Sequence, residues 1–184
     1  MSKTEHVEQQ QRRPVVLISD TLLSRTAALL ASFAVECHAE GIVYWFGIES
    51  GTTAVVTSLV VPNADTRYGC IATSPEVNAE ALAVIVDTPL VLIGQAHSHP
   101  SYKVRHSWID DRDTFARFEG ALSVVVPFFG KRGIRLSRCG VHRFLHGRFR
   151  VIGRTDMCDH LRVIPSEKDC RAAGSAAWRS SDHG

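Results

Sequence analysis

The composition and charge of this chain are those of an ordinary globular protein. Its 184 residues, 45% hydrophobic and 22% charged, suit one domain with a buried core and exclude a fibrous or wholly disordered chain. The net charge is only +2, and the sequence has neither an apolar run of membrane length nor a basic leader followed by an apolar stretch. We therefore expect a cytoplasmic protein with no membrane partner.

The first part of the chain predicts a polar arm, a strand and a helix. Residues 1–13 are rich in Gln, Glu and Lys and lack apolar periodicity, which predicts a disordered arm. Residues 15–18 form a short β-branched run, and apolar residues at helical spacing over residues 21–38 predict an amphipathic helix. Glu40 then lies in the corner between this helix and a strand predicted at residues 42–46.

The next segment predicts further strands. Residues 42–46 and 53–61 are rich in β-formers, and Ser50 with Gly51 between them predicts a hairpin. Residues 68–72 predict one more strand.

A second helix is predicted ahead of a buried strand. Ser74 is a typical N-cap and Pro75 suits the first helical position, so the helix should begin at Pro75 and run until Thr88 and Pro89 stop it. The short apolar run at residues 90–94 then predicts a buried strand.

Two histidines follow that strand. His97 and His99 are separated by one residue, so their side chains should share one face of the extended chain, which Pro100 ends. Ser107 has the character of a helix N-cap, and Asp110 lies in the first helical turn. Two imidazoles and one carboxylate form a zinc ligand set with an open fourth position, which is typical of a catalytic site in a hydrolase.

A plainer interpretation of the same residues is available. Ser107 and Asp110 also fit an ordinary capping box, and a histidine pair on a strand is often just exposed. The succession of all four residues within fourteen positions favours the metal site.

The rest of the chain predicts a helix and then several strands. Residues 111–120 should continue the helix that begins near Ser107, because Asp111 and Asp113 suit its positive end. Strands are predicted at residues 122–128, 134–136, 141–145 and 148–152, the last two as a hairpin that turns at His146 and Gly147. Together these elements predict a single α/β domain over residues 14–154, with a mixed, mostly antiparallel curved sheet flanked by helices.

A basic stretch covers part of that region. Between Lys131 and Arg154 there are eight Lys or Arg and no acid, which leaves 13 basic against 19 acidic residues elsewhere. We interpret this stretch as the solvated face of a hairpin, with an acidic protein partner as the second interpretation. Nucleic-acid binding, with Phe144 and Phe149 as stacking groups, is the third.

The C-terminal residues 155–184 are polar and rich in Ala and Ser, which predicts a loosely packed tail. The five cysteines are odd in number and lack a Cys-x-x-Cys pair, which argues against a disulfide framework. A second zinc site is disfavoured because the spacing of the remaining candidate ligands does not match paired Cys/His clusters. These ligands are Cys139, His142, Cys158, His160 and Cys170.

The His-x-His-Pro run with Ser-x-x-Asp after six residues resembles the signature of the JAMM metalloproteases, also called JAB or MPN-plus, which remove ubiquitin or ubiquitin-like proteins. The resemblance implies a JAB/MPN fold, similar to that of cytidine deaminases, with Zn²⁺ bound by His97, His99 and Asp110. It assigns to Ser107 the hydroxyl that stabilises the tetrahedral intermediate. Because the family pattern skips His106, that residue is expected to be supporting or exposed.

The resemblance also implies a catalytic glutamate near the end of the first helix, seven residues before a glycine that closes the next strand. Glu40 and Gly47 match this spacing. Glu36 and Glu49 are the rival candidates, and the spacing favours Glu40 as the general base and acid.

For substrate, the resemblance implies an isopeptide or peptide bond after the C-terminal tail of a ubiquitin-like protein, with E1-like or E2-like proteins as further partners. The short segment after Asp110 resembles that of compact bacterial members rather than that of eukaryotic relatives with a long insertion. This resemblance implies a place in a bacterial ubiquitin-like conjugation or antiphage defence system. The alternatives are a hydrolase of the same family that processes a sulfur-carrier protein or small peptide, and a non-catalytic scaffold.

Overall fold

The computed structural model describes residues 13–68 and 70–166. Almost all of the predicted N-terminal arm and most of the predicted C-terminal tail lie outside these residues, as does Cys170.

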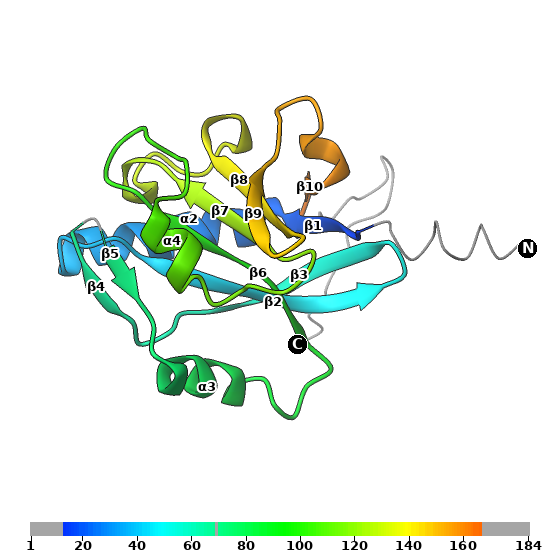
Figure 1. Ribbon diagram of the computed structural model, residues 1–184, viewed down its shortest axis with the longest axis horizontal. Helices are drawn as coiled ribbons and strands as arrows, with labels where there is room; N and C mark the ends of the chain where they lie inside the picture. The colour runs from blue at the N-terminus through cyan, green and yellow to red at the C-terminus, as the bar shows by residue number, and fades with distance from the viewer. Residues whose placement is uncertain (1–12, 69, 167–184) are drawn as a thin grey trace, which may run out of the picture.

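A mixed eight-stranded sheet forms the body of the domain, in the order β10-β1-β3-β2-β6-β7-β8-β9 (Figure 1). Its strands are β1 (Val15–Ser19), β2 (Ile42–Ser50), β3 (Thr53–Val60), β6 (Val91–Ser98), β7 (Leu122–Val126), β8 (Gly140–Leu145), β9 (Arg148–Val151) and β10 (Leu161–Ile164). Four of the seven strand pairs are antiparallel, and the pairs β10–β1, β1–β3 and β6–β7 are parallel. This architecture confirms the predicted α/β fold with a mixed, mostly antiparallel sheet.

Helices and short turns surround the sheet. The α-helices are α2 (Asp20–Glu36), α3 (Pro75–Ala83) and α4 (Trp108–Asp113), and a small hairpin is formed by β4 (Asp65–Arg67) and β5 (Cys70–Ala72). The 3-10 turns are η1 (Phe128–Gly130), η2 (Leu136–Arg138) and η3 (Met157–Asp159). Across the described ranges, no helix has both the length and the apolar character needed to cross a membrane.

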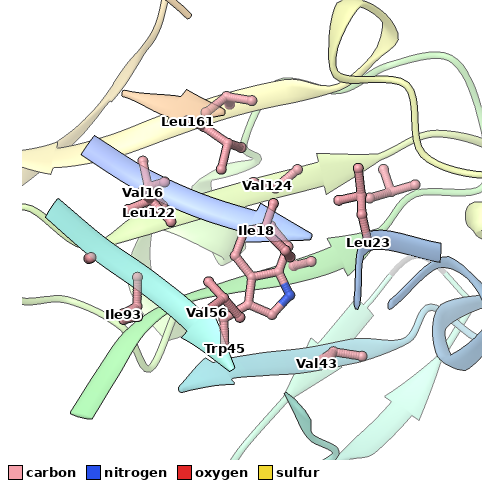
Figure 2. Close-up of a cluster of buried hydrophobic side chains, with 14 of the residues drawn as sticks. Val16, Ile18, Leu23, Val43, Trp45, Val56, Ile93, Leu122, Val124 and Leu161 are labelled. Atoms are coloured by element: carbon pink, nitrogen blue, oxygen red, sulfur yellow. The ribbon is translucent and has the colours of Figure 1, made fainter. Parts of the chain in front are cut away.

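The helix α2 covers one face of the sheet because its apolar residues recur at helical spacing. Ser19 caps it by accepting a hydrogen bond from the Leu22 N–H at 3.1 Å. Its buried side includes Leu23 and Leu30, which belong to one hydrophobic cluster with strand residues such as Trp45. Figure 2 shows Leu23 and Trp45 within this cluster. The Trp45 indole N–H donates to the Thr26 hydroxyl at 3.2 Å, so the polar atom of this fully buried ring has a partner.

The first part of β2, from Ile42 to Gly47, is buried on both faces, which explains why its sequence has no charged side chain before the exposed end at residues 48–50. Val43 and Trp45 face the cluster under α2, whereas Ile42, Tyr44 and Phe46 face a second cluster that includes Ala81 of α3. This alternation means that even-numbered positions at the start of β2 face away from α2. By the same alternation, Glu40, two residues before Ile42, has its side chain on the face that points away from α2.

Two elements predicted after the histidine pair differ from the structure. The helix at residues 107–120 ends at Asp113, because the backbone of Thr114 is extended and its hydroxyl bonds to the Asp110 carbonyl. The strand predicted at residues 134–136 does not form. Its apolar side chains, Ile134 and Leu136, pack against the main core and the chain makes a 3-10 turn there.

The helix that begins at Pro75 ends earlier than expected, at Ala83, and turns replace it up to Thr88. Val84 and Val86 are 70% and 73% exposed, so burial of apolar surface does not hold these residues in a helix.

The prediction of a loose tail from residue 155 is wrong for β10. This strand pairs in parallel with β1, with Val16 opposite Leu161, and Leu161 is 1% exposed within the main core. Four residues are too few for a convincing sequence periodicity, so the signal for a strand was weak. The folded domain therefore extends past residue 154 and includes β10.

Leu161 should contribute measurably to stability. Replacing it with Ala removes a buried side chain and leaves a cavity, so Leu161→Ala should lower the free energy of unfolding by about 2–4 kcal/mol. Val163 on the same strand is 41% exposed, and Val163→Ala should cost less than about 1 kcal/mol. Urea unfolding of both variants measures the difference. Equal, small losses would show that β10 does not belong to the core.

Candidate metal centre

The histidine pair lies at the end of a central strand. β6 is paired with β2 on one side and β7 on the other, which fixes its position in the sheet. His97 is 3% exposed, and His99 follows one residue after the strand ends. Their side chains share one face, with the two Nε2 atoms 3.2 Å apart. The structure therefore brings the two imidazoles together as the spacing predicts.

Asp110 approaches the pair from α4. Its carboxylate accepts the Ser107 N–H at 2.6 Å, and the Ser107 hydroxyl accepts the Asp110 N–H at 3.1 Å, which completes a capping box. The Asp110 carboxylate oxygens also lie 3.5 Å from the His97 Nε2 and 3.4 Å from the His99 Nε2. The plainer interpretation and the metal hypothesis thus describe one arrangement, because the cap orients the carboxylate toward the imidazoles.

These separations fit a divalent metal ion. Ligand atoms bound tetrahedrally to zinc at about 2.0–2.1 Å lie about 3.3 Å from one another, close to the distances found between the three side chains. The Nδ1 of His99 faces the Lys103 carbonyl at 2.8 Å, so this nitrogen carries the proton and leaves Nε2 free as a ligand. Within the described ranges, His97, His99 and Asp110 are the residues that converge in this way.

Charge and burial at the centre support a bound cation. Burial raises the pKa of Asp110, but hydrogen bonds and charge from His97 and His99 and the Ser107 N–H outweigh it and hold that pKa well below its usual range. Burial lowers the pKa of His99, yet Asp110 and the Lys103 carbonyl raise it overall. The carboxylate is therefore ionised at neutral pH and faces two nitrogens that can act as ligands.

Glu40 is held beside the centre by the corner between α2 and β2. The Gly41 N–H donates to the Ser98 hydroxyl at 2.9 Å, and the Ser98 N–H donates to the Gly41 carbonyl at 3.0 Å. Glu40 precedes Ile42 by two residues, and Ile42 lies opposite His97 in the sheet, so these side chains share a face. Sequence reasoning gave no role to Ser98, although its position between the two histidines made it the residue able to fix this corner.

The rival glutamates lie elsewhere. Glu36 and Glu49 are exposed, whereas Glu40 is 4% exposed. Gly47 does not close β2, which continues to Ser50. It lies at a bulge instead, where a Cβ would come within 1.8 Å of the Val55 carbonyl oxygen.

Burial raises the pKa of Glu40 to about 7, with His99 opposing the shift and Asp110 adding to it. A carboxyl group with a pKa near 7 can both accept and donate a proton at neutral pH, which is the property required of a general acid and base. Ser107, in contrast, is exposed. Its oxygen accepts the Asp110 N–H, and its own O–H has no acceptor among the described residues.

His106 is more deeply placed than the sequence indicated. Its side chain is 4% exposed, its Nδ1 lies 2.8 Å from the Asp111 carboxylate and its Nε2 lies 2.9 Å from the Ser123 hydroxyl. The ring stacks on His142 with 4.0 Å between centroids and meets the edge of Phe149 at 4.7 Å. His106 thereby anchors the loop between the histidine pair and α4 to the sheet. Only the three-dimensional stack reveals this role, because its partners come from other strands.

The raised pKa of Glu40 makes a testable prediction about stability. In the metal-free fold the neutral carboxyl is favoured, so the stability it contributes is complete below pH 4.5 and is lost as the pH rises through about 7. Glu40→Gln keeps a neutral group of the same shape at every pH. The melting temperature of metal-free Glu40→Gln should therefore exceed that of the wild type by about 5 °C at pH near 8 and match it at pH near 4.

Glu36→Gln serves as the matched control because Glu36 is exposed, and its melting temperature should follow the wild type at every pH. If the Glu40→Gln difference were also independent of pH, the raised pKa of Glu40 would be refuted.

Comparison with known proteins supports the assignment of a metalloprotease centre to His97, His99 and Asp110. No family model matches the sequence. The probable metalloprotease y4jG from Sinorhizobium fredii is 30% identical over 135 residues, which cover 71% of this chain and 82% of the relative. Among solved structures, protein DSY2949 from Desulfitobacterium hafniense shares 12% identity with a TM-score of 0.61, over 83% of this chain and 94% of that one. The likeness to DSY2949 concerns the fold alone.

AF2198, a JAB1/MPN domain protein from Archaeoglobus fulgidus, is more distant in structure, with 16% identity and a TM-score of 0.43 over 83% of this chain and 98% of that one. The kinship with a probable metalloprotease agrees with the convergence of His97, His99 and Asp110 at the end of β6. From the kinship with this relative and the convergence of these three side chains, the chain belongs to the JAMM/JAB family of metalloproteases.

Proposed function

We propose that this metalloprotease is a zinc-dependent isopeptidase or peptidase that cleaves the bond after the C-terminal tail of a ubiquitin-like protein, in deconjugation or precursor processing. The observation that carries the hydrolytic part is the position of Glu40, a buried carboxyl group with a pKa near 7 beside three converging ligands. E1-like and E2-like proteins of the same pathway are the further partners that this function would require.

The proposed ligands of the zinc ion are His97, His99 and Asp110. When bound there, zinc would supply Lewis acidity that activates water near neutral pH. Glu40 takes the proton from the attacking water and later donates it to the leaving amine. Its pKa of about 7 is close to neutral pH, so the carboxyl group can both accept and release a proton. A nearby carboxyl group that can do both is the main reason to prefer an enzyme over a scaffold.

Ser107 is proposed to stabilise the charge that develops on the scissile carbonyl oxygen. Its hydroxyl oxygen is occupied by the Asp110 N–H, so its O–H is left to donate. The capping role fixes the position of the hydroxyl, and a donor that is already oriented needs little reorganisation during the reaction. Capping and catalysis therefore use different parts of the same side chain.

A small hollow gives access to the proposed ligands. It is lined by Ile42, Ile71 and Thr73 and opens onto His97 and Asp110. Such a narrow approach suits an extended polypeptide tail better than a folded surface. The segment between α4 and β7 is short, and no long insertion interrupts it in the structure described. These features support a compact enzyme that does not grip a second ubiquitin-like protein.

Cleavage assays test this function directly. The zinc-loaded protein is incubated with ubiquitin-like proteins and sulfur-carrier proteins that carry C-terminal extensions, and products are identified by mass spectrometry. We expect cleavage after the tail of a ubiquitin-like protein. Glu40→Gln should lower kcat by about 10²–10⁴-fold, and Ser107→Ala by about 10²–10³-fold.

Glu36→Gln is the control, since this exposed glutamate should leave kcat unchanged. Cleavage of sulfur carriers alone would reassign the substrate. Full activity of Glu40→Gln would refute the proposed role of Glu40 in proton transfer. If the protein cleaved none of these substrates, the non-catalytic scaffold would be favoured.

A further inference from the structure

The basic stretch between Lys131 and Arg154 is divided in the structure. Arg143 is fully buried and donates to the carbonyls of Pro14 at 2.6 Å and Gly120 at 3.0 Å, so it is a structural residue of the sheet. Arg148 and Arg150 lie on β9, in the hairpin that the sequence predicted, and Arg154 follows it. The remaining four cations precede β8, outside the hairpin: Lys131, Arg132, Arg135 and Arg138.

Those four cations belong to residues 127–139, a segment that we call the basic loop. It lies next to the histidine pair because β6 and β7 are parallel and end at the same edge of the sheet. The His99 N–H donates to the Val126 carbonyl at 2.9 Å, and the Phe129 N–H donates to the His99 carbonyl at 2.8 Å. The basic loop is thus bonded directly to the backbone of one proposed metal ligand.

Three arginines of the basic loop surround one hollow. Arg132, Arg135 and Arg138 line it together with Phe128 and Cys139. The Arg132 guanidinium lies 4.1 Å from the centroid of the Phe128 ring, which holds its direction. Burial raises the pKa of the Cys139 thiol to about 12, so this lining residue carries no negative charge at neutral pH.

The backbone of the basic loop is constrained rather than merely exposed. Phe128, Phe129 and Gly130 have positive φ values of 55°, 57° and 73°. Two consecutive aromatic residues in the left-handed region are uncommon, and such strain persists only where the surrounding structure fixes it. The arginines therefore extend from a defined turn.

Within the described ranges, the arginines of this hollow lack acidic partners. Considering the residues that the structure describes, none of Arg132, Arg135 and Arg138 forms an ion pair with a carboxylate. Two more exposed cations, Lys103 and Arg105, flank Val104, whose carbonyl oxygen would lie 1.7 Å from a Cβ on Gly140. The start of β8 and the loop after the histidine pair are therefore in close contact.

We propose that the basic loop, extended by Lys103 and Arg105, is a docking surface for an acidic patch on the polypeptide whose tail enters the active centre. Guanidinium groups bind carboxylates in a bidentate manner, and uncompensated charge beside a site attracts partners of opposite charge. The surface adjoins a protease centre, which favours a protein over a nucleic acid as its occupant. The identification of this partner as the substrate rests on the proposed function.

Binding can be measured apart from cleavage. Fluorescence anisotropy of the full chain is recorded with three labelled probes: a peptide of alternating Glu and Gly, its Lys and Gly counterpart, and a single-stranded oligothymidine of equal length. The triple variant Arg132→Glu, Arg135→Glu, Arg138→Glu reverses the charge that lines the hollow. The matched control Arg148→Glu, Arg150→Glu, Arg154→Glu changes the same number of exposed charges outside the basic loop, and circular dichroism checks that both variants fold.

We expect the acidic peptide to bind the wild type, with an affinity that falls as salt rises, and the Lys peptide to fail. The triple variant should weaken binding about tenfold or more, and the control less than about twofold. Equal weakening by both variants, or no binding at all, would overturn the docking surface. Tighter binding of the oligothymidine through the same arginines would replace it with a nucleic-acid surface.

A second readout separates this inference from the proposed function. With a cleavable substrate in hand, the triple variant should raise KM and leave kcat nearly unchanged, because the basic loop binds without touching the reacting atoms. An unchanged KM would refute the docking surface while the proposed function stood. Specific binding of the acidic peptide without cleavage of any ubiquitin-like protein would keep the surface and refute the proposed substrate.

Discussion

The arrangement of the site depends on one local constraint, the double hydrogen bond between Gly41 and Ser98. This pair joins the start of β2 to the end of β6 across 57 residues of sequence. It fixes the register at which Glu40 faces His97 and His99. A Cβ on Gly41 would come within 2.5 Å of the Phe33 ring, so a larger residue at this corner would push the strand away from α2. Glu40 is thus positioned by the backbone of the sheet rather than by its own side-chain contacts.

The remaining parts of the centre are held by a second element, the loop that leads from His99 to α4. His106 ties this loop to β7 and β8, and the capping box at Ser107 turns the Asp110 carboxylate inward. The histidines and the Ser107 N–H keep the Asp110 carboxylate ionised, and an anionic oxygen beside two imidazole nitrogens is a donor set that divalent metals prefer. The geometry and the electrostatics therefore both favour a divalent ion between these side chains.

The sequence could predict the parts of the site that are local. The positions of His97, His99 and Asp110 follow from strand alternation and a helix cap within fourteen residues, and the structure brings these side chains together. The prediction that Glu40 belongs to the site depended on the family resemblance, because nothing in the neighbouring sequence shows that the corner between α2 and β2 meets β6. The sequence indicates no role for Ser98 and only a supporting or exposed position for His106, since the partners of both residues lie in distant strands.

The errors in the predicted fold have the same origin. β10 was interpreted as a tail because its pairing with β1 connects residues near opposite ends of the chain. The basic residues at 131–138 were assigned to a hairpin because composition shows how many charges a stretch carries but not which element holds them. In the structure they precede β8, outside the hairpin. Ile134 and Leu136 looked like a strand, but they pack into the core from a turn. Each of these features depends on contacts between distant segments, which local periodicity does not record.

The central claim is that His97, His99 and Asp110 hold a zinc ion. X-ray absorption at the zinc K-edge of the metal-loaded protein tests this claim most directly. The account predicts a first shell of nitrogen and oxygen at about 2.0–2.1 Å with the outer-shell scattering of two imidazoles, and its loss when His97 and His99 are both replaced by Ala. A sulfur shell at about 2.3 Å, or a spectrum that survives the double substitution, would contradict it.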